Sequence, residues 1–286
     1  MIAVMRVLIT GANGQLGKAL QRTLSGHDLI LKDLPEFDLT NTACEDDIVR
    51  AKPNIILHAG AYTNVDQAER DPQQAHAVNA QGTQMVAQAA KTLNARLIYV
   101  STDYVFDGTK ASPYHEQDRP QPLNQYGQSK YLGEQAVLTL CPNGLVVRTA
   151  WLFGHEGRNF VKTIMQLADE RPVLEVVADQ RGCPTYADDL ARALHQLAVS
   201  NLHGICHVTN TGDCSWYEFA QAIVSRTEGK AVVRPITTAQ AGRPAKRPTY
   251  SVLSSNRFAS HYGALPDWQD ALSRFMKRVS QPLSPA

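Results

Sequence analysis

The sequence lacks a surplus of charge of either sign. Its 286 residues include 28 lysines and arginines and 27 aspartates and glutamates, which gives a formal net charge of +1. Proteins that bind nucleic acid or a membrane surface depend on a concentrated basic field. No apolar run approaches the roughly 20 residues that a membrane-spanning helix requires. The composition therefore argues against a nucleic-acid partner and against a membrane partner.

Cysteine is also scarce, and its spacing has no pattern. The five residues are Cys44, Cys141, Cys183, Cys206 and Cys214. Their odd number and the absence of Cys-x-x-Cys spacing exclude the common metal and redox motifs. The first residues pass directly into an apolar run, without the basic region and cleavage site of a signal peptide. We expect free thiols in a reducing compartment and a cytoplasmic location.

Three glycines follow the first predicted strand. Residues 6–10 are a continuous aliphatic run, typical of a parallel strand that is buried on both faces. Gly11, Gly14 and Gly17 come next, and an amphipathic helix is predicted over residues 15–24. Glycines in such a turn let the backbone approach a diphosphate, whose charge the N–H groups at the helix start then hold. This order of elements predicts a dinucleotide site.

Further residues of this site follow later strands. Asp33 could meet the adenosine ribose hydroxyls of NAD, whereas Lys32 could receive the 2′-phosphate of NADP, so the choice of cofactor stays open. Asp38 could flank the adenine or act as a turn or cap residue. The residues predicted to bind the cofactor are Gly11, Asn13, Gly14, Gln15, Leu16, Gly17, Lys32, Asp33, Asp38, Leu39, Ala59, Gly60, Ala61, Tyr62, Tyr126 and Lys130.

A tyrosine and a lysine begin a later predicted helix. Tyr126 and Lys130 are four residues apart and would lie on one helix face. A neighbouring ammonium group lowers the pKa of a phenol from its usual ~10, which would suit Tyr126 to proton transfer near neutral pH. The apolar strand at residues 96–101 brings Thr102 and Asp103 to its carboxyl end, where a hydroxyl can bond a substrate oxygen. The alternative for the tyrosine and lysine is a chance surface pair.

Strands and helices alternate up to about residue 150. This alternation predicts an α/β fold with a doubly wound parallel sheet of the Rossmann type. We expect a dinucleotide-binding domain at residues 1–150 and a smaller, mainly substrate-binding C-terminal lobe at residues 151–286. Segments at about 175–210 should return to the Rossmann domain. In the most basic stretch, residues 242–248, Arg243 and Arg247 alternate with prolines, which suits a diphosphate or else a solvated loop.

Taken together, these motifs resemble the extended short-chain dehydrogenase/reductase superfamily. The glycine triplet and the Tyr126/Lys130 pair carry that resemblance. Residues 101–108, 148–151 and 179–185 are similar to the dTDP-4-dehydrorhamnose reductase family within it. This resemblance implies reduction of the 4-keto group of dTDP-4-dehydro-L-rhamnose by NADPH, in the last step of dTDP-L-rhamnose synthesis. Whether NADH is also accepted stays open.

The resemblance also implies roles for single residues. Tyr126 would donate the proton, and Lys130 would hold the nicotinamide ribose and lower the pKa of the phenol. Thr102 would be the third member of this catalytic triad. Dehydratases of the superfamily carry an acidic pair after this threonine, whereas Asp103 is followed by Tyr104 here, which favours a reductase. The residues expected to contact a dTDP-linked 4-ketosugar are Thr102, Asp103, Tyr104, Trp151, Asn159, Arg243 and Arg247.

One position departs from the family pattern. Some members carry a glutamate that helps bind a metal at a dimer interface, and this chain has Gln15 there. The sequence therefore gives no support for Mg²⁺, no metal ligand is assigned, and we expect a monomer or weak homodimer. Two other functions stay open, a reductase of another nucleotide-linked 4-ketosugar and a non-catalytic regulatory subunit that binds a dinucleotide. An intact proton-donor set argues against the regulatory subunit.

Overall fold

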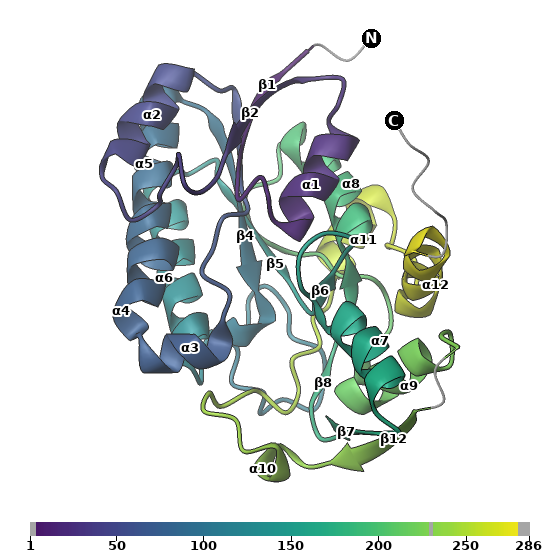
Figure 1. The fold of residues 1–286 in the computed structure, drawn as a ribbon. Coiled ribbons are helices and arrows are strands. Elements are labelled where there is room, and N and C mark those ends of the chain that lie inside the picture. The colour runs from purple at the N-terminus through teal and green to yellow at the C-terminus, as the bar shows by residue number, and fades with distance from the viewer. Residues whose placement is uncertain (1–3, 229–230, 280–286) are drawn as a thin grey trace.

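A six-stranded parallel sheet organises the protein (Figure 1). The computed structural model describes residues 4–228 and 231–279. The strand order is β10-β5-β4-β3-β1-β2, and every pairing is parallel. These strands are β1 (Arg6–Thr10), β2 (Asp28–Lys32), β3 (Ile55–His58), β4 (Arg96–Thr102), β5 (Leu145–Thr149) and β10 (Gly204–His207). The order reverses between β1 and β3, and ligands of doubly wound sheets bind at such a switch point.

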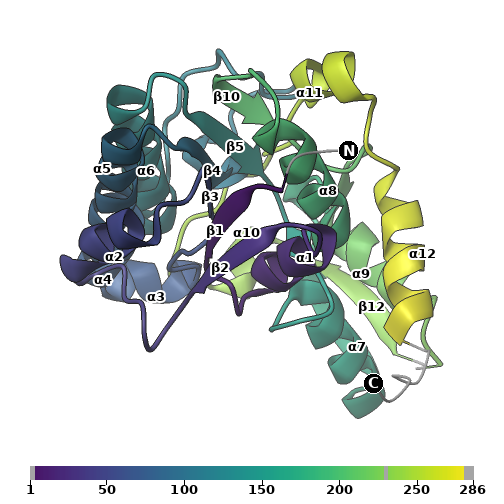
Figure 2. The same cartoon turned by 90° about the horizontal axis from the view of Figure 1, so that it is seen from above.

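Helices cover both faces of this sheet (Figure 2). On one face lie α1 (Gln15–Thr23), α8 (Ala187–Ala198) and α11 (Asn256–Tyr262). On the other face lie α2 (Ala43–Ala51), α5 (Thr83–Leu93) and α6 (Gln125–Leu140). Because both faces are covered, β5 is buried along its whole length and β1 is buried after its first residue. The predicted Rossmann-type parallel sheet is confirmed.

The chain between β3 and β4 forms several short helical segments instead of one continuous helix. It forms α3 (Val65–Arg70), α4 (Pro72–His76), a π-helical turn (Ala77–Gly82) and then α5. The π turn places the Asn79 side chain inward. Its amide bonds both the N–H and the carbonyl of Tyr62, at 2.8 and 3.0 Å, and donates to Ser129 Oγ at 2.9 Å. Asn79 therefore ties the loop after β3 to α6, in keeping with the frequent occurrence of π turns at functional sites.

The later part of the chain builds a second apolar core beside the sheet, in which Phe153, Phe219 and Phe275 pack together. Its main elements are α7 (Phe160–Glu170), β7 (Val173–Val177), α9 (Trp216–Val224), β12 (Val232–Ile236), α10 (Thr238–Ala241) and α12 (Trp268–Val279). This part of the chain also contains four short strands, which are β6 (Leu152–Phe153), β8 (Arg181–Gly182), β9 (Thr185–Tyr186) and β11 (Cys214–Ser215). The division at residue 150 stays a prediction, and both α8 and β10 pack with the main sheet.

Among the described helices, none combines the length and the apolar character needed to cross a membrane.

A buried ion pair fixes α6 to the sheet. Arg148 on β5 and Glu134 on α6 have side-chain exposures of 1% and 0%. Arg148 donates from Nε and Nη2 to the two carboxylate oxygens, at 2.9 and 2.6 Å, and Ser101 donates to Oε1 at 2.5 Å. Buried charges are tolerated when they are paired and hydrogen-bonded, and removing one partner leaves the other uncompensated. The position of α6 therefore depends on both residues.

We expect Arg148→Met to lower the free energy of unfolding by about 3–5 kcal/mol, because Glu134 would remain buried without a partner. Urea unfolding measures this loss. Arg50→Met is the matched control, because Arg50 pairs with Asp47 at the surface, with 71% of its side chain exposed. The control should change stability by less than about 1 kcal/mol. Equal effects of the two substitutions would contradict the role of the buried pair.

Candidate active site

The turn after β1 brings backbone segments into contact at the switch point. Gly11 has φ +66°, and a Cβ there would lie 2.7 Å from the Gly60 nitrogen. A Cβ on Gly17 would lie 2.2 Å from the Gly11 carbonyl oxygen. The start of α1 at Gly14 has no side-chain cap, which leaves the N–H groups of its first turn for a ligand. This geometry fits the diphosphate of a dinucleotide.

Two acidic residues lie beyond this turn. Asp33 accepts a hydrogen bond from the Asn13 N–H at 2.6 Å, so the carboxylate is held against the glycine turn. Lys32 lies next to it, with Nζ 5.6 Å from the centre of the Phe37 ring. Asp38 accepts from both the N–H and the hydroxyl of Thr40, each at 2.8 Å, which is a turn role, and it also lines the cleft.

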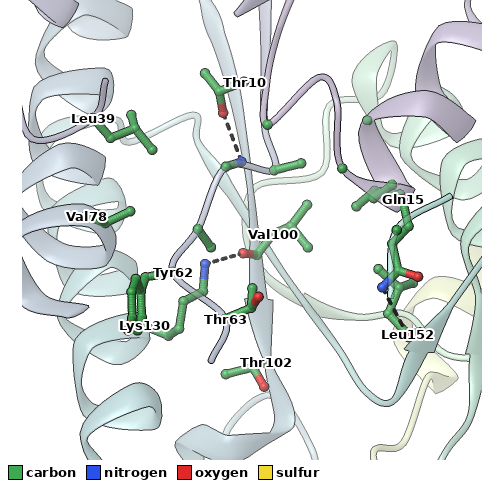
Figure 3. A pocket seen from close by; sticks show the side chains of 18 of the residues that line it. Thr10, Gln15, Leu39, Tyr62, Thr63, Val78, Val100, Thr102, Lys130 and Leu152 are labelled. Carbon is green, nitrogen blue, oxygen red and sulfur yellow. Dashed lines mark hydrogen bonds between the residues drawn. The ribbon is translucent and has the colours of Figure 1, made fainter. Parts of the chain in front are cut away.

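One cleft of about 810 Å³ is lined by every residue predicted for the cofactor. Figure 3 shows part of its wall, including Gln15, Tyr62 and Lys130. The cleft runs from the glycine turn past Gly60 and Tyr62 to Tyr126 and Lys130. Sequence reasoning missed several of its walls, namely Phe37, Thr63, Val78, Val100, Leu152, Gly157 and Arg158. Val100 lies near the carboxyl end of β4, and only this place in a parallel strand could have indicated it. Leu152 begins the short strand β6, for which the sequence gives no such signal. Arg158 has no motif around it that would have identified it.

Tyr126 and Lys130 both line this cleft from α6, and Thr102 lines it from the end of β4. Lys130 is buried, and its Nζ donates to the Val100 carbonyl at 2.7 Å (Figure 3). The ammonium group lies 4.1 Å from the centre of the Tyr99 ring, a cation–π distance. Thr102 hydrogen-bonds Tyr126. The three residues predicted for catalysis therefore lie together at the inner end of the cleft.

The pKa of Tyr126 shifts in the direction opposite to the prediction. Burial raises the pKa of this phenol to about 12, and the hydrogen bond with Thr102 only partly offsets that effect. Burial also lowers the pKa of Lys130 to about 7, against the charge of Glu134. The prediction that the pKa of Tyr126 is lowered is therefore wrong here, because burial dominates and the charge of Asp103 adds to it. The Tyr126 phenol therefore keeps its proton at neutral pH.

Asp103 lies beside this group. Burial raises the pKa of its carboxyl to about 7, despite hydrogen bonds from Ser251 Oγ at 2.6 Å and Thr102 Oγ1 at 3.1 Å.

A second pocket of about 870 Å³ lies in the C-terminal part of the chain. Its walls combine aromatic side chains with four arginines, and they include Tyr104, Phe160, Trp216, Arg171, Arg234, Arg243 and Arg247. Trp151, a wall of the first cleft, stacks on Trp216 with ring centres 3.5 Å apart. The two cavities therefore share this pair of indoles as a boundary.

The residues predicted to contact substrate are divided between these cavities. Thr102, Asp103 and Trp151 line the first cleft, and Tyr104, Arg243 and Arg247 line the second pocket.

Asn159 lines neither cavity. Its Oδ1 caps α7 by accepting from the Lys162 N–H at 3.1 Å, and its amide donates to the Gly154 carbonyl at 2.7 Å. These bonds use the side chain within the protein, and its assignment to substrate binding stays a prediction.

Gln15 is also bonded internally. Its amide donates to the Leu152 carbonyl at 3.3 Å, and its oxygen accepts from Asn159 at 3.4 Å. Within the part of the chain that the structure describes, no group of three or more His, Cys, Asp or Glu side chains could hold a metal ion.

Comparison with known proteins gives concordant findings. Residues 5–281 match the model of the RmlD substrate binding domain. A dTDP-4-dehydrorhamnose reductase from Aggregatibacter actinomycetemcomitans is 44% identical, over 93% of this chain and 97% of that protein. A Streptomyces antibioticus protein named as a probable dTDP-4,6-dihydroxy-2-methyloxan-3-one 4-ketoreductase is 40% identical, over 94% of this chain and 93% of that protein.

Among solved structures, a dTDP-4-dehydrorhamnose reductase from Bacillus anthracis in complex with NADP superimposes with a TM-score of 0.93. It is 44% identical, and the match covers 96% of this chain and all of that one. The chain therefore belongs to the RmlD family of dTDP-4-dehydrorhamnose reductases.

Proposed function

We propose that this protein reduces the 4-keto group of dTDP-4-dehydro-β-L-rhamnose to dTDP-L-rhamnose with NADPH, the last step of dTDP-rhamnose biosynthesis. The observation that carries this proposal is the meeting of Thr102, Tyr126 and Lys130 at the end of a dinucleotide-shaped cleft. Family membership supports the same substrate class. An intact proton-donor set argues for an enzyme and against a regulatory subunit, because a structural ligand needs no proton donor.

The cofactor cleft fits a dinucleotide because its glycines leave no space for side chains where the diphosphate would lie. The free N–H groups at the start of α1 would hold the diphosphate, and Asp33 and Lys32 would meet the adenosine ribose. Lys32 favours the 2′-phosphate of NADPH. Whether the enzyme also accepts NADH stays open. When bound, the cofactor supplies the hydride.

The residues of the chain supply the proton and its orientation. Tyr126 donates to the sugar oxygen, since its phenol remains protonated throughout the neutral range. The Thr102 hydroxyl orients that phenol. Lys130 binds the nicotinamide ribose and adds positive charge next to the oxygen on which negative charge develops.

The second pocket would hold the dTDP group. Its arginines present the planar N–H donors that suit a diphosphate, and the ring pair of Phe160 and Trp216, with centres 4.5 Å apart, offers an apolar surface for a base. The sugar would then lie between the pockets, beside Trp151 and Tyr126. The Streptomyces antibioticus relative favours one alternative, a reductase of another dTDP-linked ketosugar.

We further propose that the enzyme works in the cytoplasm as a monomer or weak homodimer. Gln15 supports this assembly. Metal-binding members of the family have a glutamate at this position, whereas the Gln15 amide is bonded within the chain to Leu152 and Asn159.

We expect the purified protein to oxidise NADPH when dTDP-4-dehydro-L-rhamnose is added, and Tyr126→Phe to lower kcat by about 10²–10⁴-fold while NADPH affinity is kept. The absorbance of the reduced nicotinamide measures both, and NADH is run in parallel. If the wild-type protein oxidised neither cofactor with this substrate, the proposed reaction would be wrong. Near-normal turnover by Tyr126→Phe would remove only the assignment of the proton donor.

We expect Gly17→Ala to weaken NADPH binding by at least about tenfold, because the new Cβ would overlap the Gly11 carbonyl oxygen and displace the turn. Fluorescence titration with NADPH measures the affinity. Gly26→Ala is the matched control, since a Cβ on Gly26 would meet nothing within 4 Å. Unchanged affinity in both variants would show that the close approach does not matter for cofactor binding.

We expect kcat/KM for the ketosugar to fall by about tenfold per pH unit as the pH rises above about 7. Lys130 is charged below its folded pKa of about 7 and loses its charge above it, while Tyr126 keeps its proton to about pH 12. Rates measured between pH 5.5 and 9.5 with saturating NADPH test this.

Asp103 is the control for this profile, because burial raises its pKa to a similar value. The alkaline decrease should persist in Asp103→Asn. Its disappearance in that variant would assign the titration to Asp103 instead of Lys130.

A further inference from the structure

The basic segment at residues 242–248 is fastened to the sheet domain through one carboxylate. Asp66, on α3, accepts from Arg247 Nη2 at 2.9 Å and from the Ala245 N–H at 3.2 Å. Arg243 Nη1 lies 3.6 Å from the same carboxylate. Asp66 thus joins a helix beside the cofactor cleft to two arginines that line the second pocket.

The two arginines differ in what they can offer a ligand. Arg247 is 10% exposed, and it also donates from Nη1 to the Ala245 carbonyl at 2.8 Å. It lines the second pocket together with Tyr104, and its charge acts on the Tyr104 phenol. Arg243 is 58% exposed, and its ion pair with Asp66 is the longer one. Arg247 has therefore used most of its donors inside the protein, whereas Arg243 retains donors for an anion.

Tyr104 links this arrangement to the catalytic tyrosine. It follows Thr102 and Asp103 in a 3₁₀ turn (Asp103–Val105), and its ring packs edge-on against Tyr126 with centres 6.0 Å apart. A phenol oxygen next to a guanidinium can accept a hydrogen bond from it and still has its own O–H to donate. Burial and the charge of Asp103 raise the pKa of Tyr104, so this proton is retained at neutral pH.

The same segment also contacts the beginning of α6. The amide of Asn124 donates to the Lys246 carbonyl at 2.8 Å, while its oxygen caps α6 by accepting from the Gly127 N–H at 2.7 Å. Asn124 thus fixes the position of the segment that carries Arg247 relative to the helix that carries Tyr126.

We propose that Asp66 and Arg247 are positioning residues for substrate binding: Asp66 orients Arg247, and Arg247 holds Tyr104 so that its hydroxyl donates to the bound nucleotide-diphosphate sugar. This inference rests on the proposed function, because the ligand is its sugar nucleotide. Arg243 is the arginine that contacts the diphosphate directly. The chain of contacts explains why a carboxylate lies next to a pocket built for an anion.

A double-mutant cycle of Asp66→Asn and Tyr104→Phe tests the inference. Each single substitution should raise KM for dTDP-4-dehydro-L-rhamnose about tenfold, because each removes the same substrate hydrogen bond, and should leave kcat within about threefold. The double variant should resemble Tyr104→Phe alone. If the two effects multiplied to about a hundredfold, Asp66 would not act through Tyr104 and the inference would be overturned.

Two further variants sharpen the cycle. Arg243→Gln should raise KM in a way that multiplies with Tyr104→Phe, since Arg243 meets the ligand independently. Arg247→Lys keeps a charge for Asp66 but lacks the planar fork that reaches Asp66, Ala245 and Tyr104 together, so it should behave like Asp66→Asn. Wild-type affinity of Arg247→Lys would contradict the positioning role. Unchanged NADPH affinity and urea midpoint show that each variant is folded.

Binding of dTDP-glucose, measured by calorimetry with the same four proteins of the cycle, separates this inference from the proposed reaction. Non-additive losses of affinity support the positioning role even if the wild-type protein fails to reduce the ketosugar. Additive losses overturn it even if reduction is observed.

Discussion

The site depends on how closely α6 approaches the sheet. A Cβ on Gly127 would lie 2.2 Å from the Tyr104 carbonyl oxygen, and one on Gly133 would lie 2.5 Å from the Tyr99 hydroxyl. These contacts bring α6 close enough for Lys130 to reach the Val100 carbonyl. The buried Glu134–Arg148 pair then prevents the helix from sliding, because any displacement would separate two charges that water cannot reach. Packing and electrostatics thus fix the same helix.

Burial also decides the charges in the cleft. His58, stacked on Tyr99 and bonded to Thr10 and Thr83, has its pKa lowered to about 3 by burial and by Lys130, so it stays neutral. The ammonium group of Lys130 is stabilised by a carbonyl and an aromatic ring, both weaker partners than a carboxylate. Its charge is consequently sensitive to pH, whereas Tyr126 stays protonated. In the proposed reaction, a tyrosine that keeps its proton is suited to donate it in the direction of reduction, and the neighbouring lysine is the group whose charge changes with pH.

The features predicted correctly from sequence are those set by local pattern. The continuous apolar strands and the glycine turn depend on neighbouring residues, and the structure confirms both. The pKa of Tyr126 was predicted with the wrong sign because spacing along a helix reveals a neighbouring charge but not the depth of burial. Arg243 and Arg247 differ in exposure and in the length of their ion pairs with Asp66, which is distant in sequence, so no local pattern could distinguish them.

The boundary between the two cavities shows why cofactor and sugar nucleotide would meet at one point. Trp151 has φ +46°, an unfavourable backbone angle for a bulky residue, and such strain persists only where surrounding structure enforces it. Here Gly182 provides the space, since a Cβ on it would lie 2.4 Å from the indole, and Trp216 supplies the stacking surface. The strained turn follows β5, next to Thr149 and Ala150 of the cleft wall. The strained backbone therefore places the Trp151 indole in the wall of the first cleft, stacked on Trp216 in the wall of the second pocket. In the proposed binding mode, a sugar beside Trp151 would lie within reach of Tyr126, and its diphosphate would lie toward the arginines of the second pocket.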